Sequence, residues 1–276
     1  MNNIRYLIHR LAGGLQWRWK AARVSRMLEN PSDYFAAQRG QPTGAPLRLR
    51  GGIQLFYGRE DIPDYLFDEL FLHDVYGMHS FYRPRSGDVI LDIGGNIGWF
   101  ALLCRWKAGG PIRLHSFEPD PETRGRFLHN MEANGFMGEF AVHPFAVSNR
   151  SGPAAFIRAT QPLCRGLGQG GDLEVECITL ATAFKLSGNP ARIDLLKIDI
   201  EGGEVEAIGG AGAETLAPVL RVVMEWHDRI RPGCLSACKA ALAAAGFTNV
   251  RLVYEDSRRD MGMLWACRPN LRSYSK

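Results

Sequence analysis

From Val89 onward, apolar segments of strand length alternate with segments of helical periodicity. Such alternation is typical of a parallel sheet with helices on both faces, so we predict a Rossmann-like α/β fold with a seven-stranded, mostly parallel sheet. The expected strands are Val89–Ile93, Ile112–Phe117, Phe140–Val147, Ile193–Ile200, Val219–Trp226, Thr248–Glu255 and Met261–Cys267. The expected helices include Ile97–Lys107, Pro121–Asn134 and Leu235–Ala245. A short polar turn separates the last two strands, so they should pair antiparallel at one edge.

The region before this alternation has a different pattern. Leu47 to Gly58 predicts two short strands joined at Gly51-Gly52, and Tyr65–Val75 predicts a helix. Asn30–Pro46 is rich in turn formers and predicts a linker. We therefore expect a basic helical extension and linker over 1–46, an accessory hairpin and helix over 47–86, and the main α/β domain over 87–270.

A glycine-rich insertion separates the third and fourth expected strands. It contains Gly166, Gly168, Gly170 and Gly171. This composition suits either a mobile loop over a site or a surface excursion without a role.

Positive charge is concentrated at the start of the chain. Residues 1–28 contain no acid and six basic side chains, and removing these six charges from the formal +4 leaves −2 for the rest. A slightly acidic main domain lacks the broad basic surface that nucleic-acid binding needs, so no nucleic-acid partner is expected. The segment Ile4–Leu28 predicts a helix broken near Gly13-Gly14. It either packs on its own domain or rests on an anionic membrane surface or a partner.

The six cysteines are scattered, without a Cys-x-x-Cys pair or the spacing of a zinc site. Reduced, mostly buried thiols are the expected state. No stretch reaches the roughly 20 apolar residues of a membrane-spanning helix, and the start of the chain has no apolar block of secretory type. A cytoplasmic location, with peripheral membrane contact through residues 4–28 as an option, is the expectation.

The segment from Val89 to Phe100 passes from an apolar strand through a glycine turn into a helix. Gly94, Gly95 and Gly98 would let backbone approach a ligand that a Cβ would exclude. Glu118 follows the next strand, about 20 residues after Gly98, where an acid can accept hydrogen bonds from both hydroxyls of a ribose. The turn, the strand order and the spaced acid together predict an adenosine-binding site.

The turn does not fit a dinucleotide. Gly94, Asn96 and Gly98 do not match G-x-G-x-x-G, whose helix N-terminus holds a pyrophosphate. Asp92 adds negative charge two residues before Gly94. S-adenosylmethionine has no phosphate and carries an ammonium and a sulfonium, so acids near its methionine end are favourable.

Three motifs in this order resemble those of the FkbM family of S-adenosylmethionine-dependent methyltransferases. They are Asp92-Ile-Gly-Gly-Asn-Ile-Gly98, Phe117-Glu-Pro-Asp120 and Leu196-Lys-Ile-Asp-Ile-Glu-Gly202. The match in motif order runs from about Leu47 to Val253 and includes the Tyr76 region and Met224-Glu-Trp-His227. The resemblance implies O-methylation of hydroxyls on sugars, glycolipids or polyketide-like natural products, so the expected partner is a small-molecule or glycan acceptor.

The resemblance also carries residue roles. It implies that Asp92, Gly94, Asn96 and Gly98 line the methionine and turn region and that Glu118 holds the ribose. Gly95 stands where the family commonly has alanine, and Ala181 stands where it often has aspartate after Thr179-Leu180. Because Ala181 has no side-chain acceptor, this difference affects only the capping of the helix that follows, and Thr182 can supply the cap instead. The full set of expected cofactor-binding residues is Tyr76, Asp92, Gly94, Gly95, Asn96, Gly98, Glu118, Pro119 and Asp199.

Ionisable residues crowd the carboxyl end of the strand that starts near Asp194. A period of two puts Lys197, Asp199 and Glu201 on one face. Ligands bind at the carboxyl ends of strands in such sheets, although a mutually satisfied Lys197–Asp199 salt bridge would explain the same pattern. On the next strand, Glu225 and His227 share a face.

These five side chains are the catalytic candidates. Methyl transfer is an in-line displacement, in which alignment and removal of the hydroxyl proton contribute to the rate. We expect Glu201 or His227 to take that proton, with Asp199 and Lys197 positioning groups near the sulfonium or the acceptor. Asp199, Glu201 and Glu225 would alternatively hold a divalent cation, but the spacing shows no dedicated metal ligands, so no metal is assigned.

Other functions remain open from the sequence alone. A dehydrogenase using NAD has the same architecture, although it would normally carry G-x-G-x-x-G. A non-catalytic protein could also use this fold for binding. The presence of Asp92, Gly98 and Glu118 argues against this alternative. Methylation of nucleic acid is disfavoured by the acidic remainder and by the lack of an Asn-Pro-Pro-Tyr-like motif.

Overall fold

The computed structural model describes residues 17–158, 166–168, 170–256, 260–269 and 271. These residues form two compact units, one up to His73 and one from Asp74 onward. The predicted domain boundaries are 46/47 and 86/87, whereas the two units divide at 73/74. The predicted helix break near Gly13-Gly14 lies outside the described residues.

The first unit is mainly helical with one small hairpin. Residues 17–27 are helical, and the hairpin pairs Leu47 with Leu55, which confirms the predicted two strands. The predicted helix over 65–75 is present as a helix that continues into a π-helical turn. The elements are α2 (Pro31–Gln38), β1 (Leu47–Arg48), β2 (Gln54–Leu55), α3 (Pro63–Phe67) and η1 (Asp68–Leu72).

The linker predicted over Asn30–Pro46 is partly wrong, because α2 occupies its first half. Pro31 takes the first helical position, where its fixed φ favours a helix and its missing N–H has no partner to lose. Asn30 precedes it and its amide donates to Asp33 Oδ2 over 2.7 Å. Tyr34 and Ala37 are the buried residues of this helix.

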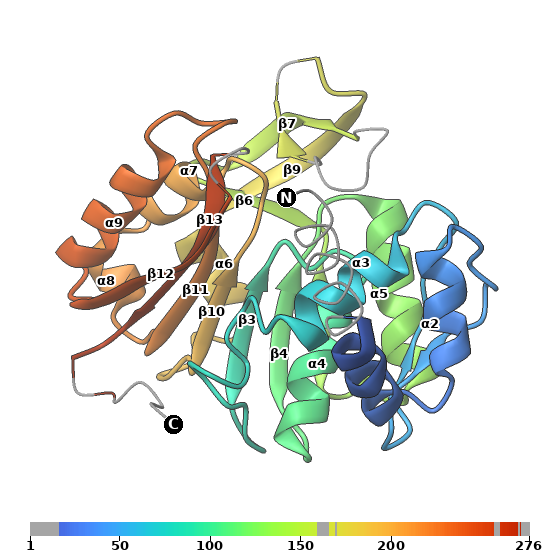
Figure 1. Cartoon of the computed structure of the whole chain (residues 1–276). Helices are drawn as coiled ribbons and strands as arrows, with labels where there is room; N and C mark the ends of the chain where they lie inside the picture. Colours follow the sequence, from blue (N-terminus) through green and yellow to red (C-terminus); the bar gives the residue numbers. More distant parts are fainter. Residues whose placement is uncertain (1–16, 159–165, 169, 257–259, 270, 272–276) are drawn as a thin grey trace, which may run out of the picture. The chain divides into compact units, whose positions relative to one another are not determined.

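A seven-stranded sheet forms the centre of the second unit, in the order β12-β13-β11-β10-β3-β4-β5. Neighbours from β11 to β5 are parallel, and β13 pairs antiparallel with both β11 and β12 (Figure 1). The antiparallel pairing of β12 with β13 at the sheet edge was predicted, whereas that of β13 with β11 was not. The strands are β3 (Val89–Ile93), β4 (Arg113–Phe117), β5 (Phe140–His143), β10 (Leu195–Ile198), β11 (Arg221–His227), β12 (Asn249–Asp256) and β13 (Met261–Cys267).

Helices cover both faces of this sheet. Figure 1 shows α4 and α5 on one side of the sheet and α7, α8 and α9 on the other. Leu196 and Ile198 of β10 pack with residues of α7 and α9 in one apolar core, whereas Lys197 between them faces the opposite side. The helices are α4 (Trp99–Ala108), α5 (Pro121–Ala133), α6 (Leu180–Leu186), α7 (Glu204–Gly209), α8 (Gly212–Leu216) and α9 (Cys234–Ala244). Among the described residues, none of the helices combines the length and apolar content that crossing a bilayer requires.

The strand predicted over Phe140–Val147 is wrong as a single element. Two strands occupy it, β5 (Phe140–His143) and β6 (Phe145–Ser148), and they belong to different sheets. Pro144 lies between them and has no N–H to donate to a sheet, so the chain leaves the large sheet at this residue.

The described part of the glycine-rich insertion consists largely of strands, although Gly168, Gly170 and Gly171 lie in the connection between two of them. It forms a four-stranded sheet of order β6-β9-β7-β8, with β7 at Gly152–Ile157, β8 at Gly166–Leu167 and β9 at Leu173–Thr179. A small core of Ala146, Phe156, Val175 and Cys177 stabilises this sheet. Apolar and acidic residues alternate at the start of β9, and this alternation is the sequence signal for a strand.

The cysteines agree with the prediction of reduced thiols. Five of them are described, and each is free and buried: Cys104, Cys177, Cys234, Cys238 and Cys267.

Candidate active site

The turn after β3 brings the carboxyl ends of three strands together. Gly94 has φ +89° and Asn96 has φ +47°, and Gly94 N donates to Phe117 O at the end of β4. A Cβ on Gly94 would lie 1.8 Å from the backbone oxygen of Asp199, which follows β10. Glycine is therefore required here because the end of β10 touches the turn.

The other two glycines are also explained by packing within the chain. A Cβ on Gly95 would lie 2.0 Å from Ser116 Oγ, and a Cβ on Gly98 would lie 2.9 Å from the Phe127 ring of α5. The sequence analysis assigned all three glycines to the approach of a ligand. The structure gives each of them a neighbouring protein atom that excludes a side chain.

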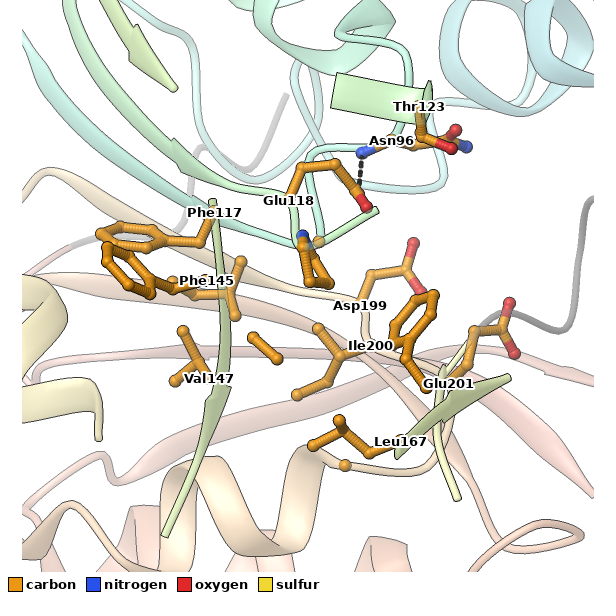
Figure 2. A pocket seen from close by; sticks show the side chains of 16 residues that line it. Asn96, Phe117, Glu118, Thr123, Phe145, Val147, Leu167, Asp199, Ile200 and Glu201 are labelled. Carbon is orange, nitrogen blue, oxygen red and sulfur yellow. Dashed lines mark hydrogen bonds between the residues drawn. The ribbon is translucent and has the colours of Figure 1, made fainter. Parts of the chain in front are cut away.

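Glu118 is held at the end of β4 by two backbone donors. Its Oε2 accepts from Asn96 N at 2.9 Å (Figure 2), and its Oε1 accepts from Asp120 N at 3.0 Å. Burial raises the pKa of Glu118 to about 7, although both hydrogen bonds act to lower it. Each carboxylate oxygen has a second lone pair, so both can still accept from a diol.

A pocket of about 710 Å³, open to solvent, lies beside Glu118. Six predicted site residues line it, namely Gly94, Asn96, Glu118, Pro119, Asp199 and Glu201. Figure 2 shows Phe117, Phe145 and Val147 on one side of the pocket and the carboxylates of Asp199 and Glu201 on the other. The pocket thus has an apolar end and an acidic end, with Glu118 between them.

The small sheet supplies part of the pocket wall. Phe145, Ala146 and Val147 of β6, Phe156 of β7 and Leu167 of β8 line it. A Cβ on Gly166 would lie 2.9 Å from Glu201 O, so β8 lies directly against the acidic end. These residues were not predicted, because the insertion was expected to be either a mobile loop over a site or a surface excursion, and neither alternative includes strands.

The remaining predicted residues lie behind the pocket wall rather than in it. They are Tyr76, Asp92, Gly95, Gly98, Lys197, Glu225 and His227, none of which lines the pocket. Their contacts show that most of them fix the residues that do.

Lys197 links two carboxylates from adjacent strands. In the sheet register it lies beside Asp92, and its Nζ is 3.1 Å from Asp92 Oδ1 and 3.7 Å from Asp199 Oδ2. It also donates to Gly94 O at 2.5 Å, and Ser116 Oγ donates to Asp92 at 3.2 Å. Burial acts to lower the pKa of Lys197, but the charges of Asp92 and Asp199 outweigh it and raise that pKa. Lys197 and Asp199 do share a salt bridge, and Asp199 also reaches the pocket.

Tyr76 completes the environment of Asp199. Its Oη donates to Asp199 Oδ2 at 2.6 Å, and its ring lies edge-on to Phe100 of α4. Burial would raise the pKa of Asp199, yet the charges of Lys197 and His227 and the Tyr76 hydrogen bond bring it below its ordinary value. Asp199 is therefore an oriented anion at the acidic end of the pocket.

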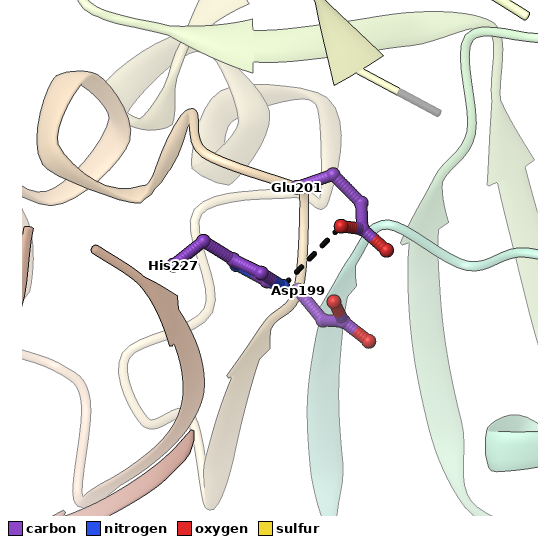
Figure 3. A group of neighbouring side chains, drawn as sticks. All are labelled: Asp199, Glu201 and His227. Atoms are coloured by element: carbon purple, nitrogen blue, oxygen red, sulfur yellow. Dashed lines mark ion pairs between the residues drawn. The ribbon is translucent and has the colours of Figure 1, made fainter. Parts of the chain in front are cut away.

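His227 ends β11 and is surrounded by acids. Its Nε2 lies 3.3 Å from Glu201 Oε2 (Figure 3). Its Nδ1 lies 3.0 Å from Glu204 Oε1, and its Nε2 is also 4.0 Å from Glu225 Oε2. Burial alone would lower the pKa of His227, but the hydrogen bond and charge of Glu204, with the charges of Glu225 and Glu201, raise it to about 10.

Glu204 also belongs to this cluster of side chains, although the sequence did not point to it. It is completely buried and accepts from Gly202 N at 3.1 Å and from Ile200 N at 3.3 Å, in addition to its contact with His227. The chain reverses between Glu201 and Glu204, with φ +53° at Glu201 and +100° at Gly202. No local periodicity predicts such a reversal, and the glycines at 202 and 203 were its only sequence signal.

Comparison with known proteins agrees with this geometry. Residues 92–257 match the family model described as the methyltransferase FkbM domain. The chain is 28% identical over 238 residues to the 31-O-demethyl-FK506 methyltransferase FkbM of Streptomyces tacrolimicus, covering 74% of this chain and 89% of that protein. It is also 28% identical over 154 residues to the hexuronic acid methyltransferase AglP of Haloferax volcanii, covering 54% of this chain and 60% of that protein.

A solved structure shares the fold. The crystal structure of methyltransferase FkbM from Methylobacillus flagellatus superposes with a TM-score of 0.51 at 15% identity, over 70% of this chain and 47% of that one. The chain therefore spans about half the length of that protein, and the likeness concerns the fold alone. Because the family model covers more than half of the sequence and includes all three motifs, the chain belongs to the FkbM family of methyltransferases.

Proposed function

We propose that this protein is an S-adenosylmethionine-dependent O-methyltransferase acting on a hydroxyl of a sugar, a glycolipid or a polyketide-like natural product. One observation carries the donor assignment, which is the carboxylate of Glu118 fixed by two backbone N–H groups beside a pocket with an apolar and an acidic end. A nucleoside with a cationic tail has matching chemistry.

The residues present fit this donor. Glu118 would accept from the ribose hydroxyls, while Phe117, Phe145 and Val147 offer apolar contact for the base. Asp199 would face the cationic end. Bound there, S-adenosylmethionine supplies an electrophilic methyl group, which the acceptor oxygen attacks while the carbon–sulfur bond breaks and a neutral thioether leaves.

Glu201 is the proposed proton acceptor, and His227 is a positioning residue. Of these two candidates only Glu201 lines the pocket, and its Oε2 rests against His227 Nε2. A carboxylate next to the acceptor hydroxyl removes its proton as negative charge develops on oxygen. Lys197 and Tyr76 keep Asp199 oriented, so they contribute through alignment.

The acceptor class is supported by charge and by the relatives. A pocket end that carries Asp199 and Glu201 disfavours an anionic acceptor and suits a neutral hydroxyl. The relative named for 31-O-demethyl-FK506 supports an oxygen acceptor, whereas the hexuronic acid in the name of the other relative carries a carboxylate that this pocket end would repel. The apolar residues Phe156 and Leu167 offer a surface on which an acceptor ring can pack.

Transfer of a radiolabelled methyl group tests this proposal. The purified chain is incubated with labelled S-adenosylmethionine and fractionated glycolipid, oligosaccharide and polyketide extracts. We expect label in one class, in a form that resists mild alkaline hydrolysis, because a methyl ether resists base and a methyl ester does not. Label that mild base releases would contradict transfer to a hydroxyl.

A substitution tests the role of Glu201. Glu201→Gln should lower kcat by about 10²- to 10³-fold, within the range for loss of a general base, and leave the affinity for S-adenosylhomocysteine unchanged. Glu214→Gln is the matched control, because it removes one exposed carboxylate in α8, outside the pocket. Near-normal turnover by Glu201→Gln would refute the assignment.

A further inference from the structure

Three potential metal ligands converge at the acidic end of the pocket. One oxygen each of Asp199 and Glu201 and one ring nitrogen of His227 all lie within 4.8 Å of one another. Figure 3 shows the imidazole of His227 pointing from β11 toward the two carboxylates that follow β10. An acidic cluster alone does not define a metal site. The burial and orientation of His227 are therefore the deciding observation.

His227 is oriented like a metal-binding histidine. Its side chain is almost completely buried, and Nε2 makes no hydrogen bond while it faces Glu201 and Asp199. Its other nitrogen, Nδ1, contacts the buried carboxylate of Glu204 at 3.0 Å. A cation that binds Nε2 displaces the proton that this nitrogen carries in the imidazolium form of His227. Nδ1–H then donates to Glu204 and the lone pair of Nε2 points at the two acids, so the carboxylate behind the imidazole fixes the tautomer that a metal requires.

The surroundings carry an excess of negative charge. Five carboxylates lie around one lysine and one histidine, namely Asp92, Asp199, Glu201, Glu204 and Glu225. Lys197 compensates Asp92 and Asp199 only in part, and Glu204 and Glu225 are buried. A group of partly buried acids with too few cations is stabilised by binding another cation.

We propose that Asp199, Glu201 and His227 form a site for one divalent cation, and that the acceptor oxygen binds this cation during methyl transfer. Two carboxylates and one imidazole suit an ion that accepts both oxygen and nitrogen ligands, such as Mn²⁺. Three protein ligands leave positions open, and Asp199 and Glu201 place the site at the pocket. Contacts of about 2.1 Å require ligand atoms no more than about 4.2 Å apart, so the carboxylates would have to turn toward the ion from the present spacing of up to 4.8 Å.

The cation would give Glu201 a second role, as a metal ligand in addition to a proton acceptor. A hydroxyl bound to a divalent cation has a lower pKa, so its proton leaves more readily. Glu201 can coordinate the cation through Oε2 while its Oε1 takes the hydroxyl proton. The acceptor oxygen keeps the electron pair of the broken O–H bond and attacks the methyl carbon with it. The role in catalysis rests on the proposed function, whereas binding of the cation does not.

Binding of Mn²⁺ to the purified full chain tests the site directly. After treatment with a chelator and dialysis, the chain is titrated with Mn²⁺, and free Mn²⁺ is followed by electron paramagnetic resonance. We expect one ion per chain. Glu201→Gln and His227→Ala should each weaken binding at least about tenfold, and Glu204→Gln by about 10- to 100-fold through the orientation of His227. Glu214→Gln should bind as the unmodified chain does.

Two further measurements keep the outcome unambiguous. Circular dichroism checks the fold of each variant, and Glu201→Gln, at a position where 22% of the side chain is exposed, stays informative if the His227 variant fails to fold. Absence of Mn²⁺ binding at millimolar concentration, or binding that survives Glu201→Gln and His227→Ala, overturns the proposal. Calorimetry with S-adenosylhomocysteine on the same sample separates the two claims, because donor binding without Mn²⁺ binding refutes only the metal site.

Discussion

Lys197 Nζ lies 3.1 Å from Asp92 Oδ1 in the middle of the parallel sheet, where both side chains are almost completely buried. Replacing the lysine alone leaves a buried carboxylate without its cation. We predict that Lys197→Met lowers the free energy of unfolding by about 3–5 kcal/mol, measured by urea denaturation. The double variant Asp92→Asn with Lys197→Met should recover most of this loss, and a double variant as unstable as Lys197→Met alone would contradict the account.

Donor binding should depend on pH through Glu118. Its pKa is raised to about 7, so the carboxylate that accepts from the ribose is present mainly above that pH and is lost as the pH falls below it. The Kd for S-adenosylhomocysteine should rise about tenfold when the pH drops from about 8 to about 6, as calorimetry would measure. Glu118→Gln has no such titration and should bind weakly with a flat profile. An equally steep profile in the variant would assign the titration to another group.

The turn after β3 should reject any side chain at Gly94. Gly94→Ala places a Cβ against Asp199 O in a backbone conformation with φ +89°, and should lower the free energy of unfolding by more than about 2 kcal/mol. Gly125→Ala is the control, since no atom lies within 4 Å of its added Cβ in α5. It should stabilise the protein by about 0.5–1 kcal/mol. Equal effects at both glycines would contradict the close approach.

The start of α6 is capped by Thr179 rather than by Thr182. Thr179 Oγ1 accepts from Thr182 N at 3.2 Å and so caps the helix. Although Ala181 replaces the family's aspartate, the cap is present, and Thr179 provides it instead of the expected Thr182. Thr179→Ala should lower the free energy of unfolding by about 1 kcal/mol in thermal denaturation. Thr182→Ala keeps the N–H donor and should change it by less than about 0.5 kcal/mol. The reverse order would restore the role of Thr182.

For the basic segment at the start of the chain, contact with an anionic membrane is one of two predicted roles, and the other is packing on its own domain. Trp17 and Trp19 are exposed on the helical residues 17–27, which also carry Arg18 and Arg26 at their surface. The full chain should sediment with vesicles of anionic lipid and much less with neutral vesicles, and the pair Trp17→Ser and Trp19→Ser should weaken this association. Equal sedimentation with both kinds of vesicle would refute electrostatic attraction.

The sequence predicted the elements whose periodicity is set by local burial. The strand that ends at Ile93, the glycine turn and the spaced Glu118 were found because each has a fixed position relative to the sheet. The faces of Lys197 and Asp199 followed from the period of two. These features depend on neighbours in sequence or on one strand-to-helix unit.

Long-range arrangements were not predictable in the same way. Pro144 was an available signal for the change of sheet, and the alternation in β9 was a signal for the small sheet, but which sheet each strand joins depends on distant partners. Glu204 reaches His227 only after the chain reverses at Glu201 and Gly202. The pocket wall from β6 to β8 was missed for the same reason.

Calorimetric titration with S-adenosylhomocysteine tests the central claim most directly, namely that the pocket beside Glu118 binds the methyl donor. We predict saturable binding of one molecule per chain, at least about tenfold weaker in Glu118→Ala, and no binding of NAD. Binding of NAD in place of S-adenosylhomocysteine, or no heat with S-adenosylhomocysteine at millimolar concentration, would contradict the account.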